Sequence, residues 1–271
     1  MKARTLLRLE NLKESRWGFL AEADFKSKLK TDVCFGTFLK LPRPEVVEIL
    51  ALCGFDFVIC DMEHAQMTER EARDVIRAGV AANIPVIVRL PDPSQGLVNR
   101  LLEAGATGIQ MPRLKSAQDI QHLYRIMHYP PLGVRSFGNA NLTAGYGTVP
   151  MKAYIEKENA RVVTVGQYET KEMEQPYEQL FEGLDVAFIG PADLSVDFGS
   201  PGQIDHPLIQ SRIDEIEKLA AKTNTTLGIF VADAEQAKRY VEKGYRCLAV
   251  AGDISMLLRS AQSLIRELKG E

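Results

Sequence analysis

From residue 33 onward, short apolar runs alternate with amphipathic segments. An apolar run bounded by turn residues predicts a buried strand, and apolar residues repeated every three or four positions predict a helix. The predicted strands span 34–39, 55–60, 85–90, 107–111, 161–167, 186–189, 226–231 and 247–251. The predicted helices span 44–53, 68–82, 116–127, 207–222, 234–243 and 254–268, and another begins at Ser94.

Local signals mark several of these boundaries. Pro44 stands at a first helical position, and Thr68 with Glu71 has the spacing of a capping box. The segment 129–150 breaks the alternation, because it is rich in glycine, proline and asparagine. It is too long for a plain connection inside a compact domain, so we expect a functional loop.

The alternation predicts an α/β fold, a (β/α)8 TIM barrel, because parallel strands need helical crossovers and right-handed crossovers close the sheet. An open, doubly wound sheet is the structural alternative. No glycine-rich dinucleotide loop follows the first strand, and no phosphate-binding lysine motif occurs, which disfavours that alternative. We expect the barrel to form the catalytic domain, residues 33–271.

Residues 1–32 differ from the rest of the chain, because leucines and aromatic residues are interleaved with arginine and lysine. This pattern predicts an N-terminal helical arm, and its basic content raises an organelle transit peptide or a membrane-surface helix as alternatives. Acidic residues within the segment count against both: Glu10, Glu14, Glu22 and Asp24. We therefore expect an arm that packs on the barrel or on a neighbouring subunit.

Composition narrows the classes of function. Among 271 residues, 33 lysines and arginines stand against 36 acids, and a formal net charge of -3 does not fit a nucleic-acid-binding protein. No apolar stretch is long enough to span a membrane, and no secretory signal pattern occurs, so we expect a cytoplasmic protein with a small-molecule ligand. The four cysteines lack the spacing of zinc or redox motifs and are expected to be reduced core thiols.

Polar residues recur where predicted strands end, which is where a TIM barrel places its active site. Glu169 follows the apolar run 162–168, and Asp193 follows the run 186–192. If these strands are neighbours, both acids reach the same rim, where hard oxygen ligands and water suit a divalent cation. A metal site is therefore the first interpretation. Other polar residues fall at strand ends: Asp61, Glu63, His64, Arg89, Gln167, Asp233 and Asp253.

Four of these strand ends carry motifs that resemble a known family. The motifs are Gly54-Phe55-Asp56-Phe57-Val58-Ile59-Cys60-Asp61-Met62-Glu63-His64-Ala65, Pro85-Val86-Ile87-Val88-Arg89, Gln167-Tyr168-Glu169-Thr170 and Gly190-Pro191-Ala192-Asp193-Leu194-Ser195. Together they resemble the class II, metal-dependent pyruvate aldolases of the citrate lyase superfamily, typified by 4-hydroxy-2-oxoheptanedioate aldolase. The resemblance covers about residues 36–264 and omits the N-terminal arm.

The resemblance implies a carbon–carbon lyase that reversibly cleaves a 4-hydroxy-2-oxo acid to pyruvate and an aldehyde through a pyruvate enolate. By resemblance, Glu169 and Asp193 hold Mg²⁺, Mn²⁺ or Co²⁺, and Arg89 donates to the developing enolate. Small residues let the substrate approach the backbone at Gly190-Pro191-Ala192, and Gln167 completes the expected substrate contacts.

His64 is the favoured general base, because an imidazole titrates near neutrality and can exchange the hydroxyl proton. In the family an aspartate often orients this histidine, and Glu103 occupies the corresponding place here. Asp61 is expected to organise Arg89 and metal-bound water together with Glu63.

One departure from the family pattern concerns the substrate. The family commonly has an arginine in the loop that corresponds to residues 138–147, where this chain has no basic residue. Lys40, after the first strand, is a candidate for a compensating charge. From this loop we expect a short or neutral aldehyde, such as a hydroxyaldehyde from a deoxy-sugar acid, rather than a dicarboxylic chain.

The resemblance also implies a homo-oligomer, a trimer or hexamer, in which the last helix is exchanged between subunits. The segment 254–261 has the apolar spacing for such packing, although it could equally close its own barrel. Two other functions stay open: another lyase of the superfamily, acting on an acyl-coenzyme A or as a decarboxylase, and a non-catalytic barrel that binds a 2-oxo acid.

Overall fold

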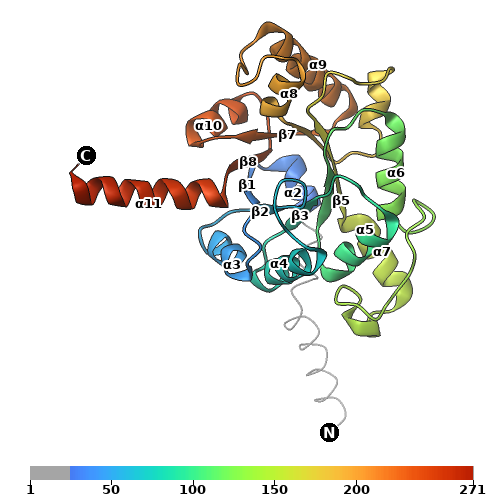
Figure 1. Cartoon of the computed structure of the whole chain (residues 1–271). Helices are drawn as coiled ribbons and strands as arrows, with labels where there is room; N and C mark the ends of the chain where they lie inside the picture. Colours follow the sequence, from blue (N-terminus) through green and yellow to red (C-terminus); the bar gives the residue numbers. More distant parts are fainter. Residues whose placement is uncertain (1–24, 271) are drawn as a thin grey trace.

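The computed structural model describes residues 25–270 and shows eight parallel strands closed into a barrel in sequence order (Figure 1). The strands are β1 (Cys34–Leu39), β2 (Phe57–Asp61), β3 (Val86–Arg89), β4 (Gly108–Met111), β5 (Val163–Tyr168), β6 (Val186–Ile189), β7 (Thr226–Val231) and β8 (Cys247–Gly252). Pairing of β1 with β8 closes the sheet, so the predicted TIM barrel is confirmed.

Helices surround the strands (Figure 1). They are α2 (Phe25–Thr31), α3 (Pro44–Leu52), α4 (Glu69–Ala82), α5 (Gln95–Ala104), α6 (Ala117–Met127), α7 (Met151–Arg161), α8 (Pro191–Asp197), α9 (Pro207–Thr223), α10 (Ala234–Glu242) and α11 (Asp253–Lys269), with 3-10 turns η2 (Gly145–Gly147) and η3 (Tyr177–Phe181). The predicted capping box is present at Thr68 and Glu71. Within residues 25–270, no helix combines the length and the apolar character needed to cross a bilayer.

Two helices were missing from the sequence prediction. Helix α7 lies directly after the long loop, and its buried residues are Tyr154, Glu158 and Arg161. A helix whose inner face is largely charged gives no apolar periodicity, which is why the pattern did not reveal it. Helix α8 follows β6 directly and is only 7 residues long.

The core has two layers. One fills the barrel interior with inward-facing side chains such as Phe38, Phe57 and Phe188. The other lies between strands and helices, where leucine, isoleucine and valine dominate. This arrangement makes the barrel a packed scaffold and leaves chemistry to the loops at its carboxyl end.

Helix α2 closes the amino-terminal end of the barrel. Phe25 and Leu29 are buried, and the Phe25 ring lies 5.6 Å from the Phe57 ring. Lys28 pairs with Asp56 just before β2. This part of the predicted arm packs on the barrel, and residues 1–24 of the arm lie outside the described residues.

Helix α11 extends away from the barrel and carries the C-terminus at its tip (Figure 1). Asp253, its first residue, is its one buried residue. The remaining helix exposes a stripe of large apolar side chains: Ile254, Leu257, Leu258, Leu264, Ile265 and Leu268. The helix therefore does not close its own barrel, one of the two arrangements that the sequence left open.

Candidate active site

A cavity of about 480 Å³ opens at the carboxyl end of the barrel. Its lining includes six polar or charged side chains predicted at strand ends or nearby: Lys40, His64, Arg89, Gln167, Asp193 and Asp253. Apolar residues complete the wall: Phe38, Pro191, Ala192, Phe230, Ala251, Ile254 and Leu258. A concave, partly apolar site with a few convergent polar groups is what a small-molecule substrate requires.

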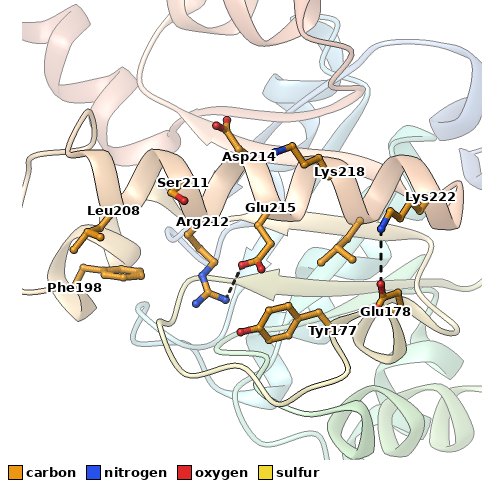
Figure 2. A pocket seen from close by; sticks show the side chains of 11 residues that line it. Tyr177, Glu178, Phe198, Leu208, Ser211, Arg212, Asp214, Glu215, Lys218 and Lys222 are labelled. Carbon is orange, nitrogen blue, oxygen red and sulfur yellow. Dashed lines mark ion pairs between the residues drawn. The ribbon is translucent and has the colours of Figure 1, made fainter.

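A second hollow, of about 610 Å³, lies on the outer surface beside α9 and η3 (Figure 2). Four of its six charged side chains pair with one another: Arg212 lies 3.3 Å from Glu215, and Lys222 lies 3.9 Å from Glu178. The hollow is larger, but none of the polar residues predicted at strand ends lines it. We therefore place the chemistry in the barrel cavity.

Glu169 is the most perturbed acid of that region. The side chain follows β5 directly and is 2% exposed. Its Oε1 accepts a hydrogen bond from the Arg113 backbone N–H at 2.8 Å, and its Oε2 accepts one from Gln167 Nε2. Burial first, and the Asp193 carboxylate second, raise the pKa of Glu169 to about 8. Two acids that repel each other in a buried site favour a bound cation.

Asp193 supplies the second carboxylate from the first turn of α8. It lines the cavity, and within residues 25–270 no side chain or backbone group donates a hydrogen bond to it. Gly190, between the two acids in sequence, makes their approach possible, because a Cβ there would lie 2.7 Å from Glu169 Oε2. The donor set fits a hard divalent cation, and the described residues hold no third His, Cys, Asp or Glu in the group. Water and substrate oxygens would complete such a coordination sphere.

Arg113 was not predicted. Its backbone adopts φ 51°, in the left-handed region that non-glycine residues rarely occupy, and this conformation accompanies the N–H bond to Glu169. Only its position just after β4 could have suggested a role. A side-chain pattern carries no information on a backbone donor.

Arg89, at the end of β3, is held rigidly by Asp61. Its Nε and Nη2 donate to the two Asp61 oxygens at 2.9 and 2.7 Å, and its guanidinium stacks 4.6 Å from the centre of the Phe38 ring. Burial alone would raise the pKa of Asp61, but the Arg89 guanidinium outweighs it and lowers that pKa. The pair is therefore ionised, and Asp61 fixes the direction of the Arg89 fork.

His64 lies on the loop after β2, at the mouth of the cavity, with a side chain 53% exposed. Its backbone N–H donates to Asp61 Oδ1 at 3.1 Å. Its Nε2 lies 3.7 Å from Glu63 Oε2, and the same oxygen lies 3.3 Å from Arg89 Nη1. The structure thus brings together His64, Glu63, Arg89 and Asp61, as the strand-end motif predicted.

Glu103 is not part of this group, which corrects the sequence prediction. Arg161, just before β5, donates to the carbonyl oxygens of Leu102 and Ala106 on either side of it, so Glu103 lies at the amino-terminal end of the barrel. His64 lies at the opposite end, and Glu63 is the carboxylate beside it. Burial raises the pKa of Glu103, and the charged side chains that act on it are Arg135 and Glu158, not His64.

The long loop is also placed differently from expectation. Gln95 donates to the Val134 carbonyl oxygen at 2.9 Å, and Asn99 donates to Ser136 at 3.1 Å, so the loop runs along α5 outside the barrel. None of residues 138–147 lines the cavity. Whether that loop contains a basic residue therefore says nothing about the charge of the cavity in this chain.

Comparison with known proteins agrees with the site. The sequence profile of HpcH/HpaI aldolase/citrate lyase matches residues 34–260. The chain is 33% identical to a hydroxypyruvate/pyruvate aldolase of Paraburkholderia phytofirmans, over 90% of this chain and 96% of the relative. It is 32% identical to a 4-hydroxy-2-oxo-heptane-1,7-dioate aldolase of Escherichia coli, over 90% of this chain and 94% of the relative.

A solved structure shares the same fold over nearly the whole barrel. The crystal structure of an HpcH/HpaI aldolase from Desulfitobacterium hafniense superimposes with a TM-score of 0.85 at 30% identity, covering 90% of this chain and 96% of the other. The resemblance inferred from the four sequence motifs is thereby confirmed. The chain belongs to the HpcH/HpaI aldolase/citrate lyase family and is a carbon–carbon lyase of the aldolase type.

Proposed function

We propose that this protein is a divalent-metal-dependent aldolase that reversibly cleaves a 4-hydroxy-2-oxo acid into pyruvate and an aldehyde through a pyruvate enolate. The observation that carries the proposal is Glu169 beside Asp193: burial first, and the Asp193 carboxylate second, raise the pKa of Glu169 to about 8. Asp193 lines the cavity that also contains Arg89 and His64, and Glu169 is buried behind two lining residues that lie next to its carboxylate, Gly190 and Gln167.

Glu169 and Asp193 are the residues that would hold Mg²⁺, Mn²⁺ or Co²⁺. When bound, such a cation supplies a Lewis acid for the carboxylate and keto oxygens of the 2-oxo acid. The hydrogen bonds from Arg113 and Gln167 fix the Glu169 carboxylate in place. Gln110 in turn donates to Gln167, so the ligand is supported by a buried chain of amides.

Arg89 has the geometry to stabilise the negative charge that develops on the enolate oxygen. Asp61 occupies its Nε and one hydrogen of Nη2, and its Nη1 lies 3.3 Å from Glu63, which leaves N–H groups of this cavity-lining side chain for a ligand. Because the guanidinium is already oriented, little reorganisation is needed as charge develops.

The substrate carboxylate would lie against the backbone that begins α8. Gly190 N–H already donates to the Tyr168 carbonyl oxygen at 3.1 Å, and Pro191 has no N–H. In the first helical turn, the amides of Ala192 and Asp193 have no partner inside the helix. Gly190 and Pro191 therefore offer no free N–H group and only shape the wall of the site. The amides of Ala192 and Asp193 remain to bind the carboxylate.

His64 is the group placed to accept the proton of the C4 hydroxyl. Its exposure lets the ring reach a substrate at the cavity mouth, and Glu63 Oε2 lies 3.7 Å from its Nε2. In the synthetic direction the same ring returns the proton to the alkoxide.

We also propose that the protein forms a homo-oligomer, a trimer or a hexamer, through α11. The helix has an apolar stripe of more than four turns that no residue among 25–270 covers. A second copy that supplies the same helix would bury the stripe, as closed symmetric assemblies do.

The test is pyruvate release from a series of 4-hydroxy-2-oxo acids, with added Mg²⁺, Mn²⁺ or Co²⁺ and with a chelator. Exchange of pyruvate methyl protons with D₂O, followed by NMR, reports enolisation without any aldehyde. We expect both reactions to require metal and to be lost in Glu169→Gln but kept in the surface control Glu156→Gln. Full activity in the presence of chelator would refute metal dependence, and the absence of both reactions would refute the aldolase proposal.

A further inference from the structure

Lys40 is held at the rim of the cavity by its backbone. It follows β1, and its N–H and that of Leu41 donate to Asp253 Oδ2 at 3.0 and 2.7 Å. Asp253 is buried at the start of α11, where its Oδ1 accepts from the Ile254 N–H. This connection between β1 and α11 fixes where the lysine side chain begins.

Lys40 lines the cavity, where its ammonium forms an ion pair with Asp61 but donates no hydrogen bond to the residues that the structure describes. Its Nζ lies 3.5 Å from Asp61 Oδ2, and the side chain is 34% exposed. Asp61 already accepts two hydrogen bonds from Arg89 and two from the backbone of Glu63 and His64. Within residues 25–270, Lys40 Nζ donates no hydrogen bond, so its three N–H groups are available to a ligand.

The order of the strands shows which end of a substrate would meet this ammonium. Glu169 follows β5, and in a closed eight-stranded barrel β5 lies opposite β1, which Lys40 follows. His64 follows β2, next to β1. A substrate with its 2-oxo acid end at Glu169 and its C4 hydroxyl at His64 would direct its far end toward Lys40.

Much of the wall of the cavity that Lys40 lines is apolar. Phe38, Phe230, Ile254 and Leu258 contribute to it, together with polar residues that include Asp253 and Ser255. An ammonium beside apolar surface binds an anion more strongly than the same group in open solvent, because less water competes for it.

We propose that Lys40 is a specificity-determining residue that binds a negatively charged group, a carboxylate or its equivalent, at the far end of the aldehyde half. The inference rests on the proposed aldolase function and names the substrate class of that same site. It replaces the expectation of a neutral aldehyde, which depended on residues 138–147, none of which lines the cavity.

The experiment compares two aldehydes that differ in charge in their condensation with pyruvate. Succinic semialdehyde carries a carboxylate, and methyl 4-oxobutanoate is its neutral ester. The value of kcat/KM for each aldehyde is measured for the wild type, Lys40→Gln, Lys40→Arg and the control Lys152→Gln. Lys152 is 89% exposed on α7, so its replacement makes the same charge change away from the cavity.

We expect the wild type to prefer the anionic aldehyde and Lys40→Gln to lower the ratio of the two kcat/KM values by about tenfold or more. The ratio cancels any general effect of the substitution on the shared chemistry. Lys40→Arg should keep most of the preference, Lys152→Gln all of it, and added salt should weaken it in the wild type only.

Three results would overturn the role of Lys40: an unchanged ratio in Lys40→Gln, a wild-type preference for the ester, or exchange of pyruvate protons without condensation of the anionic aldehyde. Failure of the aldolase proposal looks different. In that case the wild type neither exchanges pyruvate methyl protons in the presence of metal nor condenses pyruvate with either aldehyde.

Discussion

Replacing Glu169 by glutamine should make the metal-free protein more stable at neutral pH while abolishing its response to metal. Glutamine keeps the size of the side chain but removes the charge that burial and Asp193 oppose. The amide must place its oxygen toward one of the two donors, Arg113 or Gln167, and its nitrogen toward the other. The amide nitrogen then faces a donor, which lowers the stability of the variant by an amount that does not change with pH. The pH dependence of the stability difference therefore reports only the removed charge.

The magnitude follows from the pKa. Glu169 has a pKa of about 8 in the folded protein, raised from an ordinary value of 4.5. Between these values the folded protein holds a proton that the unfolded chain has released, so the free energy of unfolding falls as pH rises, by about 1.4 kcal/mol per pH unit. At pH 7 the free energy of unfolding is therefore about 3 kcal/mol lower than at pH values below 4.5.

The assay is urea unfolding of the wild type and Glu169→Gln from pH 5 to pH 8, in chelator and then in Mn²⁺. The difference between the two free energies of unfolding should grow with pH in chelator. Saturating Mn²⁺ at about 100 times its Kd should stabilise the wild type by about 2.7 kcal/mol and leave the variant unchanged. Glu156→Gln, on the exposed face of α7, is the matched control. Parallel pH profiles for the wild type and Glu169→Gln, or equal stabilisation by Mn²⁺, would refute the reasoning.

Three further predictions concern the enolate, the ligand geometry and the assembly. Arg89→Lys should lower kcat/KM for retro-aldol cleavage about a hundredfold or more, because lysine cannot reproduce the fixed guanidinium fork; near wild-type turnover would contradict this. Gly190→Ala should weaken Mn²⁺ binding, measured by calorimetry, by at least about tenfold, because its Cβ would lie 2.7 Å from Glu169 Oε2; Gly96→Ala, which meets no atom closer than 3.4 Å, is the control. Leu264→Asp should lower the mass measured by light scattering, because it places a charge in the apolar stripe of α11, where Leu264 is 57% exposed, and a buried charge would disrupt the subunit interface proposed there. An unchanged mass would exclude the stripe as the interface.

The sequence predicted the strands well because each strand is a local apolar run. The predictions for 34–39, 186–189 and 226–231 match β1, β6 and β7 residue for residue, and the other strands differ by one or two residues at their ends. The parallel barrel followed from the alternation alone. The proximity of Glu169 and Asp193 could be predicted because strand order in such a barrel fixes which loops share a rim.

What sequence could not reveal depends on contacts between distant segments. Helix α7 buries Glu158 because Arg135, from the long loop, lies 2.9 Å from it, and no local pattern encodes that pair. The position of Glu103 matched a family motif, but the direction of α5 carries it to the far end of the barrel. The entry of Lys40 into the cavity depends on Asp253, more than two hundred residues later in the chain.

The most direct test of the central claim is the number of Mn²⁺ ions bound per chain, measured by equilibrium dialysis with EPR detection of free Mn²⁺, for the wild type and Asp193→Asn. If Glu169 and Asp193 share one cation, the wild type binds one ion per chain, and Asp193→Asn weakens this binding by at least about a hundredfold. Binding of Mn²⁺ to Asp193→Asn with wild-type affinity, or no binding to the wild type, would contradict the account.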